Sequence, residues 1–148
     1  MENTVYYLPG RGGRVATGLG EGILDLGCKL KGRETPWSFE GLTFTEQLEL
    51  ITQDLRADFW TENAKVVAVS YGAYLLLNAL SEHKPFPGSI LILSPILGQV
   101  TGGESMRHYS PPRPSRIIEL AKAGLFPPPK HIELHVGDSP LCQDSCRL

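Results

Sequence analysis

The sequence predicts an α/β fold, a three-layer α/β/α arrangement in which helices cover both faces of a mainly parallel sheet of about four to five strands. Short apolar runs of strand length alternate along the chain with longer segments of helical periodicity. Clusters of Gly and Pro separate these segments, and no internal repeat is visible. Such alternation is typical of β-α-β units with right-handed crossovers and buried parallel strands.

The first two elements are a strand and a helix. The run "VYYL" (5–8) is cut off by "PGRGGR" and therefore predicts a buried strand that feeds a loop. Apolar residues at intervals of three and four predict a helix from Val15 to Leu30, although four glycines lie inside it. The polar segment 31–42 is interpreted as an irregular connection.

The later elements repeat the alternation, with a long loop rich in Gly, Ser, Pro and Arg at 98–116. They are a helix over 45–60 capped by Thr43 or Thr45, strands over 65–70, 89–94 and 131–136, and helices over 71–83 and 115–126.

Composition excludes several kinds of partner. The 148 residues carry a net charge of −2, which gives no reason to expect nucleic acid or an anionic membrane. No long apolar run or signal-peptide pattern occurs, so we expect a cytoplasmic protein with one domain over 1–148. The cysteines are odd in number, with Cys142 and Cys146 close together, which favours reduced thiols; we expect neither a metal site nor a cofactor.

The loops at the carboxyl ends of the strands are the candidate ligand-binding region, because open parallel sheets bind ligands at that rim. They are "PGRGG" (9–13), the turn at Ser70, "SPILG" (94–98) and "GDSP" (137–140).

Ser70 joins an apolar strand to an apolar helix and is the candidate nucleophile. A nucleophile elbow needs small residues two positions before and after its serine, and Ala68 and Gly72 stand there. The oxyanion would be stabilised by the N–H of Tyr71 at the helix N-terminus and by that of Arg11 or Gly12 in the glycine loop. The alternative is that Ser70 is only a helix cap, for which serine is favoured.

The glycine loop has a second interpretation, as a cradle for phosphate in a nucleotide-binding module. The sequence "GRGGRV" places Val15 where the dinucleotide fingerprint needs glycine, so that fingerprint fails.

The segments "VYYLPGRGG", "VVAVSYGAYLLLNAL", "SILILSP" and "HIELHVGDSP" resemble, in order and separation, the α/β-hydrolase fold superfamily. The similarity is to small bacterial serine hydrolases of the retinoblastoma-binding-protein-9 type. The resemblance implies that Ser70 is the nucleophile, that Asp138 is the triad acid, and that Tyr71 and the glycine loop form the oxyanion hole.

The sequence departs from that family where the triad histidine is expected. Ten residues follow Asp138 and none is His. Of the four histidines, His83 is predicted to lie at the far rim, His131 at the wrong end of its strand, and His135 toward a helix layer. His108, in the long loop, is the remaining weak candidate for the base.

The tail 139–148 has no periodicity and is atypical for the end of such a domain. Three explanations stay open: a truncated or frameshifted reading frame, a His supplied by a partner subunit, or a domain that has lost hydrolysis. A sheet that ends with strand 131–136 exposes an edge that can pair with another chain, which makes a homodimer a reasonable hypothesis.

The sequence therefore predicts a serine hydrolase-like protein that acts on a small ester, thioester or amide through an acyl-enzyme at Ser70, impaired by the missing histidine. The alternative is a non-catalytic domain of the same fold that binds a ligand or a protein.

Overall fold

The structure is a computed structural model, and it describes residues 3–99 and 110–137. Its elements are β1 (Thr4–Leu8), α1 (Leu19–Asp25), β2 (Lys29–Gly32), a 3₁₀ turn (Phe39–Gly41), α2 (Phe44–Asp54), a π-helical turn (Leu55–Phe59), β3 (Lys65–Val69), α3 (Tyr71–Leu80), β4 (Ser89–Leu93), α4 (Arg116–Lys122) and β5 (His131–His135).

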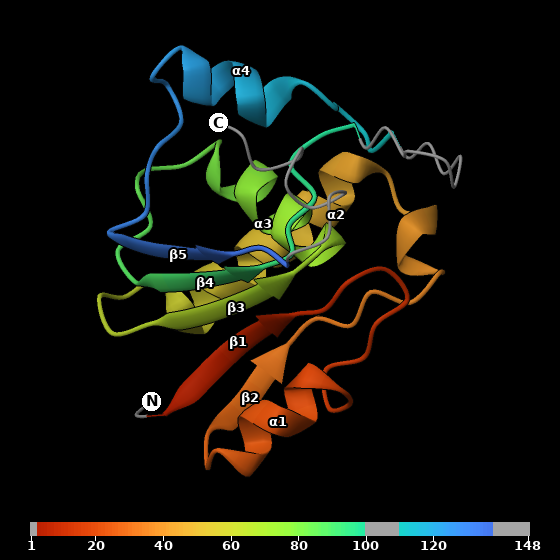
Figure 1. Cartoon of the computed structure of the whole chain (residues 1–148), viewed down its shortest axis with the longest axis vertical. Coiled ribbons are helices and arrows are strands. Elements are labelled where there is room, and N and C mark those ends of the chain that lie inside the picture. The colour runs from red at the N-terminus through yellow and green to blue at the C-terminus, as the bar shows by residue number, and fades with distance from the viewer. Residues whose placement is uncertain (1–2, 100–109, 138–148) are drawn as a thin grey trace.

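The five strands form one parallel sheet in the order β2-β1-β3-β4-β5 (Figure 1). The predicted α/β fold with a parallel sheet is therefore confirmed. All strands point the same way, so the loops after β1, β3, β4 and β5 leave the sheet at the rim formed by the carboxyl ends of the strands, as expected from the sequence.

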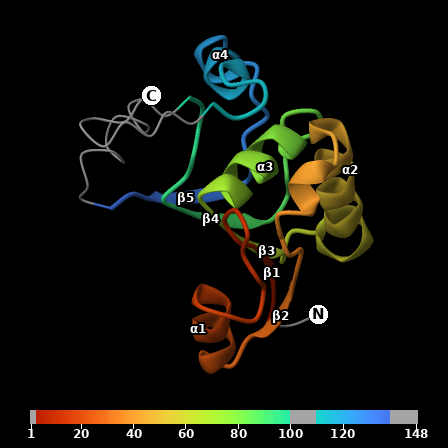
Figure 2. The same ribbon diagram turned by 90° about the vertical axis from the view of Figure 1, so that its right-hand side faces the viewer.

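Helices lie on both faces of this sheet (Figure 2). α2 and α3 cover one face and α4 packs beside α3, whereas α1 lies on the opposite face, over β1 and β2. Every residue of α3 is buried. That burial explains its nearly continuous apolar sequence, because a helix between a sheet and other helices has no solvent-facing stripe. Each fully buried leucine of α3 contributes roughly 2 kcal/mol of transfer free energy.

α2 begins with a capping box. Thr43 accepts a hydrogen bond from the Glu46 N–H (3.2 Å), and Glu46 accepts one from the Thr43 N–H (2.7 Å). Of the two caps that the sequence allowed, the structure uses Thr43. The buried face of α2 presents Leu48 and Ile51 to the core.

The predictions for 15–30 and 31–42 were wrong in extent. The helix covers only Leu19–Asp25, and a parallel strand, β2, occupies Lys29–Gly32 at the sheet edge. Gly18 and Gly27 adopt positive φ (58° and 82°) and so break the helical backbone on either side. The sequence did not predict β2 because this strand is short, polar and largely exposed, and so has no apolar run.

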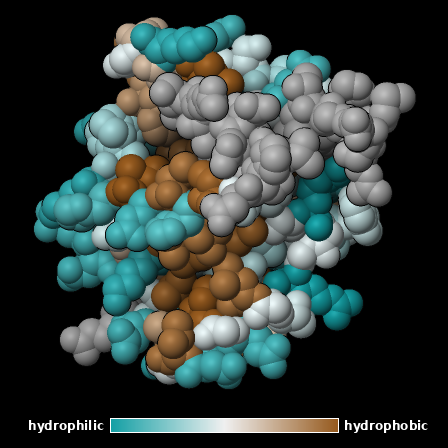
Figure 3. Space-filling model, viewed as in Figure 1, coloured by the Kyte–Doolittle hydropathy of each residue, from teal (hydrophilic) through white to brown (hydrophobic). Residues whose placement is uncertain are grey.

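The α1 side of the sheet is only partly covered. Val67, Val69, Leu91 and Leu93 are half-buried there, and Figure 3 shows an apolar strip running across this side of the molecule. His135 shares the register of Leu93 on this side and is exposed, so of the buried or edge histidine expected there the structure shows the edge histidine. Within the described ranges, no helix is both long and apolar enough to cross a membrane.

Candidate active site

Ser70 occupies a strained turn between β3 and α3. Its backbone has φ 52° and ψ −116°, a combination that costs a residue with a side chain of order 1–3 kcal/mol. The Ser70 side chain makes no capping hydrogen bond to α3, so the helix-cap interpretation has no support from the geometry. Such strain at a strand-to-helix turn is the geometry expected of a nucleophile elbow.

Main-chain hydrogen bonds hold this turn in place. The Ser70 N–H donates to the Leu93 carbonyl (3.1 Å), which extends the pairing of β3 with β4. The Ser70 carbonyl accepts from the N–H of Tyr74 (3.2 Å) and from that of Ile96 (3.3 Å). The turn is therefore fixed by the helix that follows it and by the loop after β4.

The small neighbours of Ser70 are required by close packing. Ala68 is fully buried. A Cβ on Gly72 would lie 2.4 Å from the Pro9 carbonyl oxygen and 2.5 Å from that of Leu8. Any side chain at 72 would therefore displace the first turn of α3 from the end of β1.

The glycine loop after β1 lies beside the serine. A Cβ on Gly10 would be 3.5 Å from the Ser70 Cβ and 3.9 Å from its Oγ. Gly10 is thus the residue of "PGRGG" that the structure places next to Ser70. Arg11 and Gly12, the residues predicted to carry the second oxyanion donor, follow it directly.

Arg11 and Gly12 also meet an exposed tryptophan. The Arg11 guanidinium pairs with Glu40 (2.5 and 3.1 Å) and lies 5.3 Å from the ring centroid of Trp37. Gly12 has a positive φ of 68°, and a Cβ there would approach Trp37 to 3.3 Å. Trp37 is 68% exposed and so forms an apolar wall beside the loop.

Thr35 fixes the glycine loop from the other side. Its hydroxyl donates to the Gly10 carbonyl, and its N–H donates to the Gly13 carbonyl (3.1 Å). Thr35 is almost fully buried, so its side of these hydrogen bonds is shielded from solvent. The loop is therefore preorganised rather than held only by its own turn.

None of the three histidines in the described ranges is hydrogen-bonded to Ser70. His83 contacts Thr52 (3.3 Å) and Arg56 (3.2 Å), near the end of α2. His131 begins β5, while His135 ends it and pairs with Glu133 (3.5 Å). The positions predicted for His83 and His131 agree with this arrangement.

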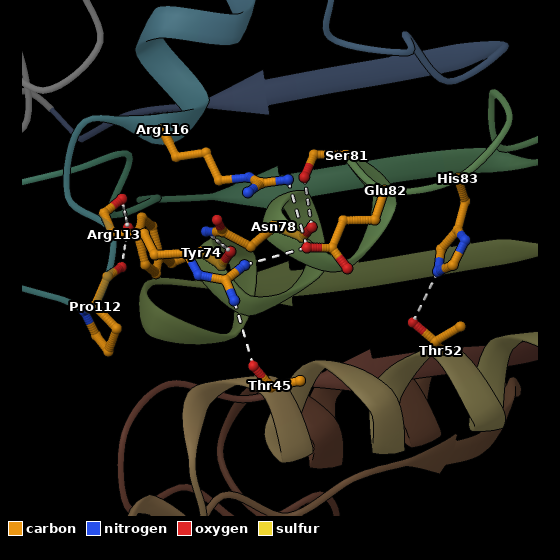
Figure 4. Close-up of polar contacts among 10 residues, drawn as sticks. All are labelled: Thr45, Thr52, Tyr74, Asn78, Ser81, Glu82, His83, Pro112, Arg113 and Arg116. Carbon is orange, nitrogen blue, oxygen red and sulfur yellow. Dashed lines mark hydrogen bonds and ion pairs between the residues drawn. The ribbon is translucent and has the colours of Figure 1, made fainter.

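The end of the long loop is anchored behind α3 (Figure 4). The Tyr74 hydroxyl donates to the carbonyls of Pro112 (2.6 Å) and Arg113 (2.8 Å). The guanidinium groups of Arg113 and Arg116 pair with Glu82 (3.1 and 3.4 Å). Residues 110–116 are thereby fixed to α3 on the side that carries α2 and α4.

A partly buried polar cluster links β1, the chain after β2, and α2. Asp54 accepts a hydrogen bond from the Tyr6 hydroxyl (2.7 Å) and a bidentate pair from Arg33 (2.7 and 2.6 Å). Burial, followed by the contact with Asp54, strongly raises the pKa of Tyr6. The hydrogen bond to Asp54 also raises the pKa of Arg33. This cluster ties β1 and the chain after β2 to the end of α2.

Asp138, His108, Cys142 and Cys146 lie outside the described residues. The part of the chain that the structure describes holds no group of three metal-ligating side chains, and Cys28 there is a free thiol.

Comparisons of the chain with protein-family models, with curated proteins and with solved structures found no match.

Sequence reasoning found Ser70, its small neighbours and the glycine loop, but it missed Thr35 and Trp37. Both lie in the segment that was interpreted as irregular. The aromatic and hydroxyl residues of that segment carried no periodic signal, so only the fold reveals that they support the loop beside Ser70.

Proposed function

We propose that this protein is a serine hydrolase with an α/β-hydrolase-like fold that acts on a small ester, thioester or amide. The strained backbone of Ser70, with φ 52° and ψ −116° at the carboxyl end of a central strand, is the observation that carries the proposal. The Ser70 side chain caps no helix, and its backbone conformation costs free energy. Presenting the Ser70 hydroxyl at the carboxyl-end rim of the sheet is a physical reason for that cost.

In the proposed reaction, the Ser70 Oγ forms a bond to the acyl carbonyl carbon and loses its proton to a base. The carbonyl oxygen takes up the negative charge and is stabilised by the main-chain N–H groups of Tyr71 and of Arg11 or Gly12. Collapse of this intermediate expels the alcohol, thiol or amine, which takes up a proton, and leaves an acyl-serine that water hydrolyses. Asp138 would orient the base.

The preorganised glycine loop supports this assignment. Gly10 lies against Ser70, and Thr35 holds the loop through two hydrogen bonds. Donors that are fixed before the substrate arrives need no reorganisation in the transition state.

Turnover is expected to be slow, because no described histidine is hydrogen-bonded to Ser70. In serine hydrolases that lose a triad member, the oxyanion hole and substrate binding retain about 10³–10⁴-fold acceleration over water. A slow acyl-transfer activity is therefore the expected result.

A fluorophosphonate probe tests the proposal directly, because it labels activated serines. We expect labelling at Ser70, identified by peptide mass, and none in Ser70→Ala. Ser94→Ala is the matched control: Ser94 is exposed, directly follows the neighbouring strand β4 and also has a positive φ (44°). Absence of labelling across the pH range, with the fold intact, would overturn the proposal.

The second candidate is a non-catalytic ligand-binding domain, favoured because no described histidine is hydrogen-bonded to Ser70. A ligand that raises the melting temperature equally in the wild type and in Ser70→Ala, with no probe labelling in either, would support this candidate.

A further inference from the structure

Among the described residues, β5 is an edge strand of the sheet. It is last in the strand order, and all five of its residues are exposed. Ile132 and Leu134 are 44% and 42% exposed, although they share the register of the buried Ile90 and Ile92. An exposed apolar edge strand is a template for pairing with another strand.

The main-chain groups that β5 presents to solvent can be assigned from its pairing with β4. Ser94 donates its N–H to the His135 carbonyl (2.8 Å), so the main chain of His135 faces β4. Because the direction alternates along a strand, Ile132, Leu134 and Val136 direct their N–H and C=O groups outward.

A two-fold axis at Leu134 matches these groups to their own copies. In this antiparallel register Leu134 faces itself and Ile132 faces Val136 of the second copy, and both are hydrogen-bonded pairs. The apolar side chains then meet apolar side chains on the face that carries α3.

Charge on the other face favours the same register. Glu133 lies opposite the second copy's His135, and His135 lies opposite the second copy's Glu133, at the closely spaced, non-hydrogen-bonded positions. The carboxylate accepts a hydrogen bond from the imidazole in each pair. An axis at Glu133 would instead oppose two carboxylates, and an axis at Ile132 would oppose Leu134 to Lys130.

We propose that two copies of this chain associate through β5, antiparallel about an axis at Leu134, and join their sheets into one continuous sheet. The partner is a second copy because the sequence "HIELHV" is complementary to itself in charge, in polarity and in main-chain hydrogen bonding in this single register.

A cross-linking experiment tests the register. In a background with Cys28, Cys142 and Cys146 replaced by Ser, Leu134→Cys would place two thiols on Cα atoms about 5.5 Å apart, within disulfide range. Oxidised glutathione should convert it to a covalent dimer. Ile132→Cys is the matched control, because its two copies would be about 13 Å apart and should remain uncross-linked.

Light scattering and a charge exchange complete the test. The wild type should have twice the 16.2 kDa mass of one chain. Glu133→Lys should weaken association about tenfold, and adding His135→Glu should restore it. Glu119→Lys, the same charge change on α4, should have no effect. A monomeric wild type, or cross-linking of Ile132→Cys as readily as Leu134→Cys, would overturn the proposal.

Discussion

Gly72 packs directly against Pro9: a Cβ on Gly72 would lie 2.4 Å from the Pro9 carbonyl oxygen. This contact joins the first turn of α3 to the end of β1, where the glycine loop begins. The position of Ser70, two residues before Gly72, therefore depends on how closely the helix approaches the strand.

Gly72→Ala should destabilise the protein by about 1–3 kcal/mol, because the added methyl group meets two main-chain carbonyls that cannot rotate away. Chemical denaturation measures the change. Gly22→Ala in α1 is the control: its Cβ would meet nothing within 4 Å, and alanine there should stabilise by about 0.5–1 kcal/mol. Equal effects at both sites would show that the contact at Gly72 is unimportant.

Ser70→Gly should be more stable than Ser70→Ala by about 1 kcal/mol. Glycine adopts φ 52° and ψ −116° without a clash between side chain and backbone, whereas alanine retains that clash. Thermal unfolding of the two variants measures the difference, and both should lose probe labelling. If alanine proved as stable as glycine, the backbone at Ser70 would not be strained.

The sequence predicted the elements with a strong periodic signal and the residues whose chemistry depends on local spacing. β1, β3, β4, α2 and α3 were found because burial imposes an apolar pattern on each, whereas β5 kept its apolar residues although all five of its positions are exposed. Ser70, Ala68 and Gly72 were found because an elbow constrains positions two residues apart.

The elements that the sequence missed depend on tertiary contact. β2 forms at an edge, where pairing with β1 needs no apolar run. Thr35 supports the glycine loop through hydrogen bonds that span more than twenty residues of sequence, and no local pattern encodes such a contact.

Thr43→Ala should destabilise the protein by about 1 kcal/mol, because it leaves an N–H of the first turn of α2 without its side-chain acceptor. Urea denaturation measures the loss. Thr45→Ala, two residues later, removes only a hydroxyl that accepts a hydrogen bond from Arg113 (3.3 Å), so it should lower the free energy of unfolding by less. A larger loss at Thr45 would contradict the assignment of the cap.

Tyr6 should make the protein sensitive to alkali. Its pKa is raised above the ordinary tyrosine value of 10.0 by burial and by Asp54, so the folded state keeps a proton that the unfolded chain loses. Stability is therefore fully present below pH 10 and falls above it, by about 1.4 kcal/mol per pH unit for this one group.

The variant Tyr6→Phe isolates this effect. It should lose about 1 kcal/mol at neutral pH, because the hydrogen bond to Asp54 is gone, yet its free energy of unfolding should fall less steeply than that of the wild type above pH 10. Tyr7→Phe is the variant for comparison, because Tyr7 lies on the α1 side of the sheet and burial alone raises its pKa. This variant should also make the free energy of unfolding fall less steeply above pH 10. Urea denaturation at a series of pH values measures both slopes. Because the Asp54 carboxylate adds to the burial of Tyr6, the slope should change over a wider pH range in Tyr6→Phe than in Tyr7→Phe. Identical pH profiles for the wild type and Tyr6→Phe would show that the Tyr6 hydroxyl titrates normally in the folded protein.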